Sequence, residues 1–300
     1  MAFRAVARAT DKRTLFSACL TQGVCCHKLN LITLLKITSL KFIPLILNSF
    51  VFDWIVRLRL AGIELSQFIM QDCPVLRPET VAVLNDIAEL LNNHDRVFCK
   101  YRSDEKGAFA ITEAELLRLK IISDAVISKL YGLDYEDLKF ILADCDHPVA
   151  SMSNKKFCAK LNPKGFWRVD KERPPEQRQT VLTLVAFQEL EKLIEQTGDQ
   201  DAGIKAFLAL NNGEGWMLPE QLRLADYGLG HDAEAKGFPP VASAYGPRFY
   251  DWQLAQTLEE FRKECEIHTY NLNIGRDGCT VPEEELPETE RPEIEQPTLF

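Results

Sequence analysis

The stretch LNSFVFDWIVRLR, residues 47–59, carries the clearest structural signal in the chain. It closes an apolar run from Leu29 to Leu60 that is interrupted at Lys36, Lys41, Asn48, Asp53 and Arg57. Because these interruptions leave no window of about 18 uncharged residues, a membrane-spanning helix is not expected here. The run instead predicts a buried strand followed by a buried helix from about Pro44 to Arg59.

Length and composition set the scale of the fold. With 300 residues, of which 46% are hydrophobic and 26% charged, the chain can bury one large core or two smaller ones. Its net charge of -9 is unevenly spread, because residues 1–80 hold ten Lys or Arg against five acids, whereas the tail from Asp277 holds one Arg against eight. The N-terminal part can therefore meet phosphate, and the acidic remainder should face solvent or a protein partner.

The nine cysteines do not form a metal or disulfide pattern. Their only close set is Cys19, Cys25 and Cys26, and no Cys-x-x-Cys pair occurs. We expect reduced, mostly structural thiols. Together with the lack of a signal peptide, this predicts a cytoplasmic location.

Hydrophobic periodicity predicts an α+β, mainly helical fold. Apolar and β-branched residues alternate with turns in the first part of the chain, and the spacing becomes helical from Glu79. The predicted organisation is a small mixed α/β N-terminal segment (1–78), a helical segment (79–150), a linker (151–164), a helical C-terminal domain (165–275) and a disordered acidic tail (276–300).

Helix-end signals refine two of these segments. The sequence Thr112-Glu113-Ala114-Glu115 is typical of a capping box that opens a helix, which Gly132 can end. Asp134 can then cap a short helix through Leu142.

Three further helix signals lie in the C-terminal part. Pro174-Pro175 predicts the start of a helix to about Gln196, which Gly198 stops. A last helix is expected from about Tyr250 to Tyr270.

Several segments together resemble one protein family, the large adenine-specific DNA methyltransferases of type IIG-like restriction-modification systems. The chain is similar to their C-terminal part, that is, the end of the target-recognition domain (residues 1–78) followed by a helical extension. Only the acidic tail lacks a counterpart, and residues 16–45 match least. The segments that carry the resemblance are 4–15 (RAVARATDKRTL), 47–59, 129–133 (KLYGL), 165–171 (GFWRVDK), 179–187 (QTVLTLVAF), Trp216, 223–232 (RLADYGLGHD) and 248–252 (RFYDW).

The family's catalytic motifs are missing from this sequence. Methylation of adenine needs a flipped base held by an Asn-Pro-Pro-aromatic type of motif and a glycine-rich loop for the methyl donor. Asn162-Pro163-Lys164 lacks the second proline and the aromatic residue, and Gly228-Leu229-Gly230 does not follow a strand. We therefore expect no catalytic residues, cofactor site or metal site in this chain, and we expect S-adenosylmethionine to bind the missing catalytic part.

The resemblance implies contacts to double-stranded DNA by basic residues of the recognition portion. On the helix, Arg57 and Arg59 diverge by about 200°, so only one can face a groove, and the other should cap the helix end. Solvated surface charges are the alternative interpretation. The candidate DNA-binding residues are Arg4, Arg8, Arg13, Lys28 and Arg57.

Three weaker constellations have ordinary explanations. Glu220 with Glu234 and Lys236 loosely fits a magnesium nuclease, but a charged surface loop is the simpler interpretation. The other two are a possible metal cluster at Asp144, Asp146 and His147, for which an exposed helix end is favoured, and a possible thiol site at Cys25, Cys26 and His27, whose neighbouring side chains point to opposite faces of a strand.

These observations predict a DNA-binding and docking fragment or subunit of an adenine-specific methyltransferase, inactive by itself. Its partners would be double-stranded DNA and a catalytic methyltransferase or restriction polypeptide, with no membrane. The alternative is a non-catalytic protein-interaction module or the relic of a truncated gene.

Overall fold

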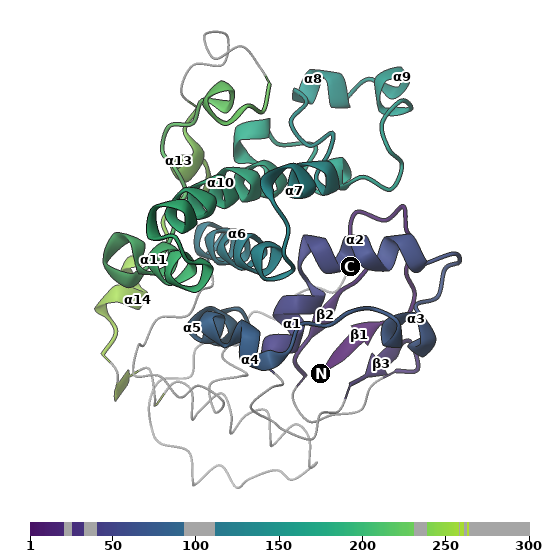
Figure 1. Cartoon of the computed structure of the whole chain (residues 1–300), viewed down its shortest axis with the longest axis horizontal. Coiled ribbons are helices and arrows are strands. Elements are labelled where there is room, and N and C mark those ends of the chain that lie inside the picture. Colours follow the sequence, from purple (N-terminus) through teal and green to yellow (C-terminus); the bar gives the residue numbers. More distant parts are fainter. Residues whose placement is uncertain are drawn as a thin grey trace, which may run out of the picture.

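The computed structural model describes residues 1–20, 26–32, 41–92, 112–230, 239–257, 259–260 and 263. In these residues the chain is mainly helical, with one small sheet near the N-terminus (Figure 1), which confirms the predicted fold class. The predicted acidic tail lies outside the described residues.

The sheet has three short antiparallel strands in the order β2-β1-β3. They are β1 (Ala2–Arg4), β2 (Ser17–Ala18) and β3 (Leu29–Leu31). Ala2 lies opposite both Ala18 and Leu31, so β1 is the central strand.

The helix expected from Pro44 to Arg59 is two helices, which corrects the prediction. They are α1 (Phe42–Leu47) and α2 (Phe50–Arg59). Ser49 adopts an extended conformation between them, and its side chain accepts a hydrogen bond from the Phe52 N–H at 3.2 Å. A serine in this position begins a new helix because it satisfies an amide that has no partner within the helix.

Two of the predicted helix starts are confirmed. Thr112 accepts from the Glu115 N–H at 3.2 Å at the start of α6 (Glu113–Leu130), and Asp134 forms a capping box with Asp137 at the start of α7 (Tyr135–Ile141). Gly132 separates these helices with a φ of 80°. Glu115 does not complete a capping box, because its carboxylate is bound by Arg118 and Arg248.

The region around the predicted linker and the start of the next helix differs from expectation. Residues 151–164 include the end of α8 (Val149–Met152) and all of α9 (Lys155–Cys158). The Pro174-Pro175 pair begins a short 3₁₀ turn, and α10 starts only at Gln179 because Arg178 is extended. Gly198 ends α10 in the left-handed conformation, as predicted.

The remaining helices complete the described fold. The helix expected from Tyr250 to Tyr270 is interrupted, since Gln256 is extended, and residues 264–270 lie outside the described residues. The remaining elements are α3 (Gln67–Gln71), α4 (Pro78–Val81), η2 (Ala82–Leu84), α5 (Asn85–Asn92), η4 (Phe166–Arg168), η5 (Pro175–Gln177), α10 (Gln179–Thr197), α11 (Gln200–Gly213), η6 (Leu224–Tyr227), α13 (Val241–Tyr245) and α14 (Asp251–Ala255).

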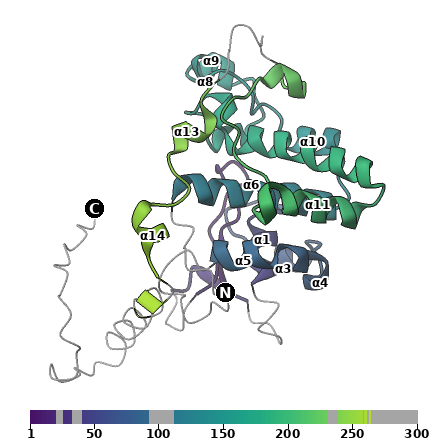
Figure 2. The same cartoon turned by 90° about the vertical axis from the view of Figure 1, so that its left-hand side faces the viewer.

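Helix α6 lies at the centre of the molecule. It packs on α10, α2 and α5 (Figures 1 and 2), and its residues are buried on nearly all sides, as expected of a helix that other elements surround. One continuous hydrophobic cluster joins Phe50 of α2, Ile122 of α6 and Phe187 of α10. The N-terminal segment is therefore packed onto the same core as the later helices.

Candidate nucleic-acid interface

A buried carboxylate on α2 holds the N-terminal segment in place. Asp53 is fully buried and accepts hydrogen bonds from the backbone N–H groups of Thr14, at 2.9 Å, and Leu15, at 3.2 Å. The same carboxylate forms ion pairs with Arg57, at 2.7 Å, and Arg13, at 3.2 Å. The carboxylate thus has four donors, which is the condition under which a buried charge is stable.

Arg57 is buried together with Asp53. Its Nη2 donates to the carbonyl oxygens of Asp11, at 3.2 Å, and Lys12, at 2.7 Å, while its Nη1 donates to the carbonyl of Lys164. Its guanidinium carbon lies 3.8 Å from the centre of the Phe166 ring. Burial lowers the pKa of Arg57, and Asp53 opposes that change.

These contacts correct the assignment of Arg57 as a DNA contact. All three of its nitrogens already donate within the chain and its side chain is 2% exposed, so it does not face a groove. Arg59 is exposed and donates to the Ile55 carbonyl at 3.3 Å, so it caps the end of α2 as expected of one of the two arginines. The signal for the ion pair is present in the sequence, because Asp53 and Arg57 are four residues apart on a helix.

Arg13 is also mostly withdrawn from solvent. Besides its ion pair with Asp53, it donates to the Asn48 carbonyl, and its guanidinium lies 4.6 Å from the centre of the Phe50 ring. Its side chain is 13% exposed. In this arrangement Arg13 stabilises the start of α2 and presents little charge to a ligand.

Of the other three candidates, Arg4 and Lys28 lie at one end of the sheet, and Arg8 lies four residues beyond β1. Arg4 is opposite Leu29 in the β1–β3 pair, and the N–H of Ala5 donates to the Lys28 carbonyl at 2.9 Å, so Arg4 and Lys28 occupy adjoining backbone segments. Arg8 follows on the same segment as Arg4. Arg8 and Lys28 are exposed, whereas Arg4 is half exposed and lies 3.5 Å from the carboxylate of Asp11.

Charge in this region is mainly positive. Glu64, whose backbone pairs with Val6, is an exposed acid beside this segment, but residues 1–20 and 26–32 contain five basic residues and one acidic residue, in a chain whose net charge is -9. Asp11 is that acid, and it accepts from the backbone N–H of Arg8 as well as from Arg4. The surface around Arg8 and Lys28 can therefore attract phosphate, which makes it the candidate interface.

A second buried carboxylate connects three helices. Asp124 of α6 accepts from the Phe50 N–H at the start of α2, at 2.9 Å, and from the side-chain amide of Gln179 on α10, at 3.0 Å. Burial raises the pKa of Asp124 to about 6, although Arg13 and these hydrogen bonds act in the opposite direction. Asp124 therefore fixes the position of α2. Above about pH 6 its carboxylate is charged, and burial of that charge opposes folding.

A pocket of about 370 Å³ with a mixed lining lies between α6 and the start of α10. Its charged groups are largely engaged within the chain. Arg173 pairs with Glu113 and lies 4.4 Å from the centre of the Tyr245 ring, and Asp170 accepts from the Gln179 N–H at 2.6 Å. The pocket is lined by Glu113, Leu116, Leu117, Lys120, Val169, Asp170, Arg173, Gln179 and Tyr245.

The weaker constellations are only partly within the described residues. His147 lies 3.7 Å from Asp144, but no group of three or more His, Cys, Asp or Glu side chains suited to a metal occurs in the part of the chain that the structure describes. Glu220 accepts from the Ser243 N–H at 3.2 Å. Cys26 and His27 are both exposed, whereas Cys25, Glu234 and Lys236 lie outside the described residues.

The chain matches no protein with which it was compared, and its described helices are too short or too polar to cross a membrane. Comparison of the chain with models of protein families, with curated proteins and with solved structures finds no match. Among the helices that the structure describes, none is both long and apolar enough to cross a membrane.

The ion pair at Asp53 gives a stability prediction. Asp53→Asn leaves the buried Arg57 without a countercharge, so we expect the free energy of unfolding to fall by about 3 kcal/mol. Chemical denaturation of the variant and the wild type measures the change. Asp72→Asn, at an exposed aspartate on the same part of the chain, is the control. A loss at Asp53 no larger than that of the control would contradict the assigned role.

Replacement of Asp124, unlike replacement of Asp53, is expected not to destabilise the chain near neutral pH. Its pKa is raised from 3.8 to about 6, so between these values the folded chain holds a proton that the unfolded chain releases, and stability falls as pH rises through this window. Asp124→Asn should keep both hydrogen bonds, since the amide of Gln179 can reverse. We expect the variant to be at least as stable as the wild type at about pH 7 and to lose about 1 kcal/mol less between about pH 5 and pH 7.

Denaturation curves at both pH values test this prediction, with Asp72→Asn again as the control. A variant with the pH dependence of the wild type would show that Asp124 titrates normally.

Proposed function

We propose that this chain is a non-catalytic DNA-binding and docking polypeptide that acts with a catalytic adenine-specific DNA methyltransferase in the cytoplasm. Two things support the proposal. The sequence resembles the C-terminal part of such enzymes, and Arg8 and Lys28 are both exposed in an N-terminal region in which basic residues outnumber acids. The second observation is the one that carries the DNA-binding part.

The chemistry of this surface suits the DNA backbone. Lys and Arg side chains bind phosphate oxygens and release condensed counterions, which gives affinity without sequence preference. Through their ion pairs with Asp53, Arg13 and Arg57 stabilise the N-terminal segment that carries Arg8. On this account the partner supplies S-adenosylmethionine, the catalytic groups and the flipped-base pocket.

Exposed apolar side chains support a docking role. Phe140 of α7 is 71% exposed and packs edge-on against Trp54 of α2, with 6.5 Å between the ring centres. Leu58, one turn beyond Trp54 on the same helix, is 60% exposed. Large apolar groups that gather on a surface often mark a protein contact. This patch is also the observation that favours the second candidate, a protein-interaction module without DNA binding.

The DNA-binding proposal predicts a specific loss of salt dependence. We expect the chain to bind a labelled duplex of about 30 base pairs at about 50 mM salt and to weaken steeply towards about 200 mM. In Arg8→Gln/Lys28→Gln the slope of log K against log[salt] should become shallower by about 2, because two phosphate contacts are lost. Fluorescence anisotropy over a salt series measures the slope.

The control carries the same charge change on a different surface. Lys192→Gln/Lys205→Gln alters two lysines of α10 and α11 and should retain the wild-type slope. Absence of binding by the wild type at low salt would exclude DNA binding and leave the protein-interaction module as the better account.

A further inference from the structure

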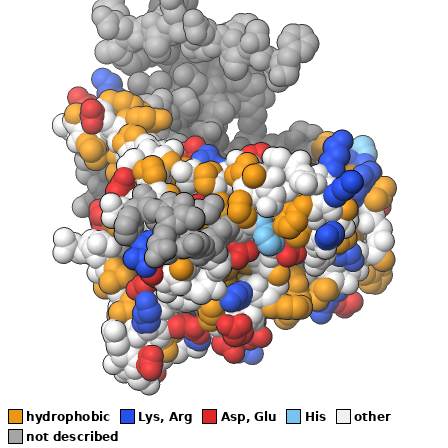
Figure 3. Space-filling view, turned by 90° about the horizontal axis from the view of Figure 1, so that it is seen from above, with side chains coloured by type: hydrophobic (Ala, Val, Ile, Leu, Met, Phe, Trp, Pro, Cys, Tyr) orange, Lys and Arg blue, Asp and Glu red, His pale blue; other side chains and the backbone are white. Residues whose placement is uncertain are grey.

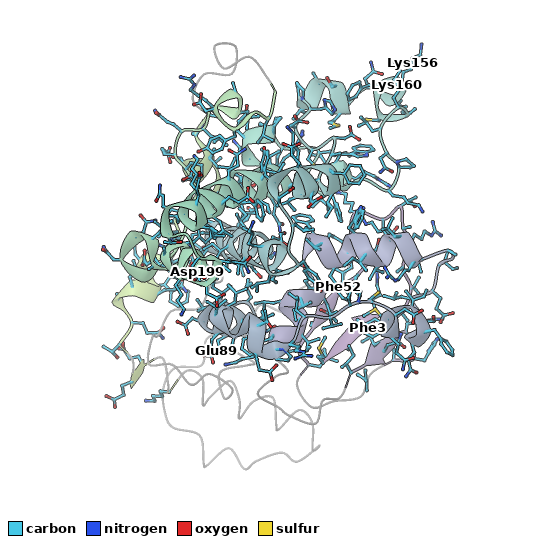
Figure 4. All side chains as sticks on the ribbon, in the orientation of Figure 1. Phe3, Phe52, Glu89, Lys156, Lys160 and Asp199 are labelled. Carbon is cyan, nitrogen blue, oxygen red and sulfur yellow. The ribbon has the colours of Figure 1, made fainter. Side chains whose placement is uncertain are left out.

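A second basic surface lies in residues 151–164, the segment predicted to be a linker. Residues 151–164 contain four lysines and no acidic residue, and all four lysines are exposed. Figure 4 shows Lys156 of α9 and Lys160, which follows α9, at the outer edge of the molecule. We call Lys155, Lys156, Lys160 and Lys164 the lysine surface.

The backbone beneath the lysine surface is well anchored. The side chain of Asn154 accepts from the N–H groups of Lys156, at 2.9 Å, and Phe157, at 3.3 Å. Phe157 packs edge-on against His147 with 4.9 Å between ring centres, and the indole N–H of Trp167 donates to the Asn162 carbonyl at 2.8 Å. The lysines therefore project from a defined backbone, so binding has to order only their side chains.

The lysine surface adjoins residues 10–12, which follow Arg8. The guanidinium of Arg57 binds the carbonyl of Lys164 with one nitrogen and the carbonyls of Asp11 and Lys12 with another. Arg168 donates to the Thr10 carbonyl across the same junction. One buried side chain thus holds together two loops that both carry exposed lysines. Seen from above in Figure 3, Lys and Arg side chains gather at the right-hand end of this face.

Few acids offset this positive charge. Lys12 has Glu172 at 3.9 Å, and Asp144 accepts from the Asn162 N–H at 3.4 Å. In the described part of the chain, none of the four lysines of the lysine surface takes part in an ion pair. Their ammonium groups are free to bind an external anion.

The side chains around the lysines favour a nucleic acid over a protein partner. Ser153, Asn154 and Asn162 are exposed beside them, and hydroxyl and amide groups of this kind commonly contact phosphate. Protein interfaces instead deplete lysine and centre on large apolar anchors. The strongly exposed aromatic residues Phe68 and Phe140 lie on α3 and α7, not on this segment.

We propose that the lysine surface binds the sugar–phosphate backbone of duplex DNA and extends the track that begins at Arg8. This inference rests on the DNA-binding function proposed above and adds the second half of the contact surface. Lysine is a compact point charge that matches phosphate without reading bases. The lysine surface therefore supplies affinity that is independent of sequence.

The test removes three of the four charges. In Lys155→Gln/Lys156→Gln/Lys160→Gln, affinity for a labelled duplex of about 30 base pairs should fall on the order of tenfold or more at about 50 mM salt, and the slope of log K against log[salt] should become shallower by about 2 to 3. The matched control is Lys139→Gln/Lys192→Gln/Lys205→Gln, which makes the same charge change on α7, α10 and α11. Thermal unfolding followed by circular dichroism verifies that both variants remain folded.

Three outcomes would overturn the inference. If the wild type binds the duplex and both triple variants bind alike, the lysine surface is not a DNA contact, while the proposed function stands. If the wild type does not bind at all, the inference and the proposed function fail together. If polyglutamate displaces the wild type at the same charge concentration as unlabelled duplex, the surface binds polyanions without preference for DNA, which contradicts a specific duplex contact.

Discussion

The buried ion pair between Asp53 and Arg57 is the constraint on which the rest of the N-terminal structure depends. Asp53 binds the backbone of residues 14–15, and Arg57 binds the backbone of residues 11–12 and of residue 164. Removing two charges from water is costly, and the cost is recovered only when their hydrogen-bonding groups are satisfied. The pair therefore specifies one position of this segment on α2, because displaced positions would leave a buried charge unpaired.

A chain of buried polar contacts carries this constraint into the helical body. Asp124 on α6 binds the first amide of α2 and the side chain of Gln179 on α10. At the other end of α6, hydrogen bonds from Arg118 and Arg248 hold the pKa of Glu115 below its ordinary value although burial opposes this. The two carboxylates of α6 thus behave differently: Glu115 is bound by two arginines, whereas Asp124 relies on neutral donors.

The sequence predicted features that depend on neighbouring residues. Thr112, Asp134 and Gly198 mark helix ends because a cap acts within one turn, and the structure confirms all three. The expectation of one helix from Pro44 to Arg59 overlooked the local cap signal of Ser49, which binds the Phe52 N–H. The second support of this division is the hydrogen bond from the Phe50 N–H to Asp124, a residue from a distant part of the chain. A contact across that separation leaves no local pattern.

The candidate site was predictable only in part, for the same reason. Arginines that bind phosphate and arginines that bind a buried carboxylate have the same local sequence, so the sequence predicts Arg13 and Arg57 as DNA contacts together with Arg4, Arg8 and Lys28. Exposure separates them, and exposure is a property of the folded chain. The polar composition of residues 151–164 predicts a linker. In the structure, the lysines of this segment lie on an anchored backbone that adjoins residues 10–12.

Amide hydrogen exchange of the wild-type chain tests the central claim most directly. If Asp53 and Arg57 fix the N-terminal segment on the helical body, the N–H groups of Thr14 and Leu15 should exchange as slowly as the core amides of α6, because opening them requires separation of the buried pair. Exchange at the rate of unprotected loop amides would contradict the account, since the segment that carries Arg8 would then be free of α2.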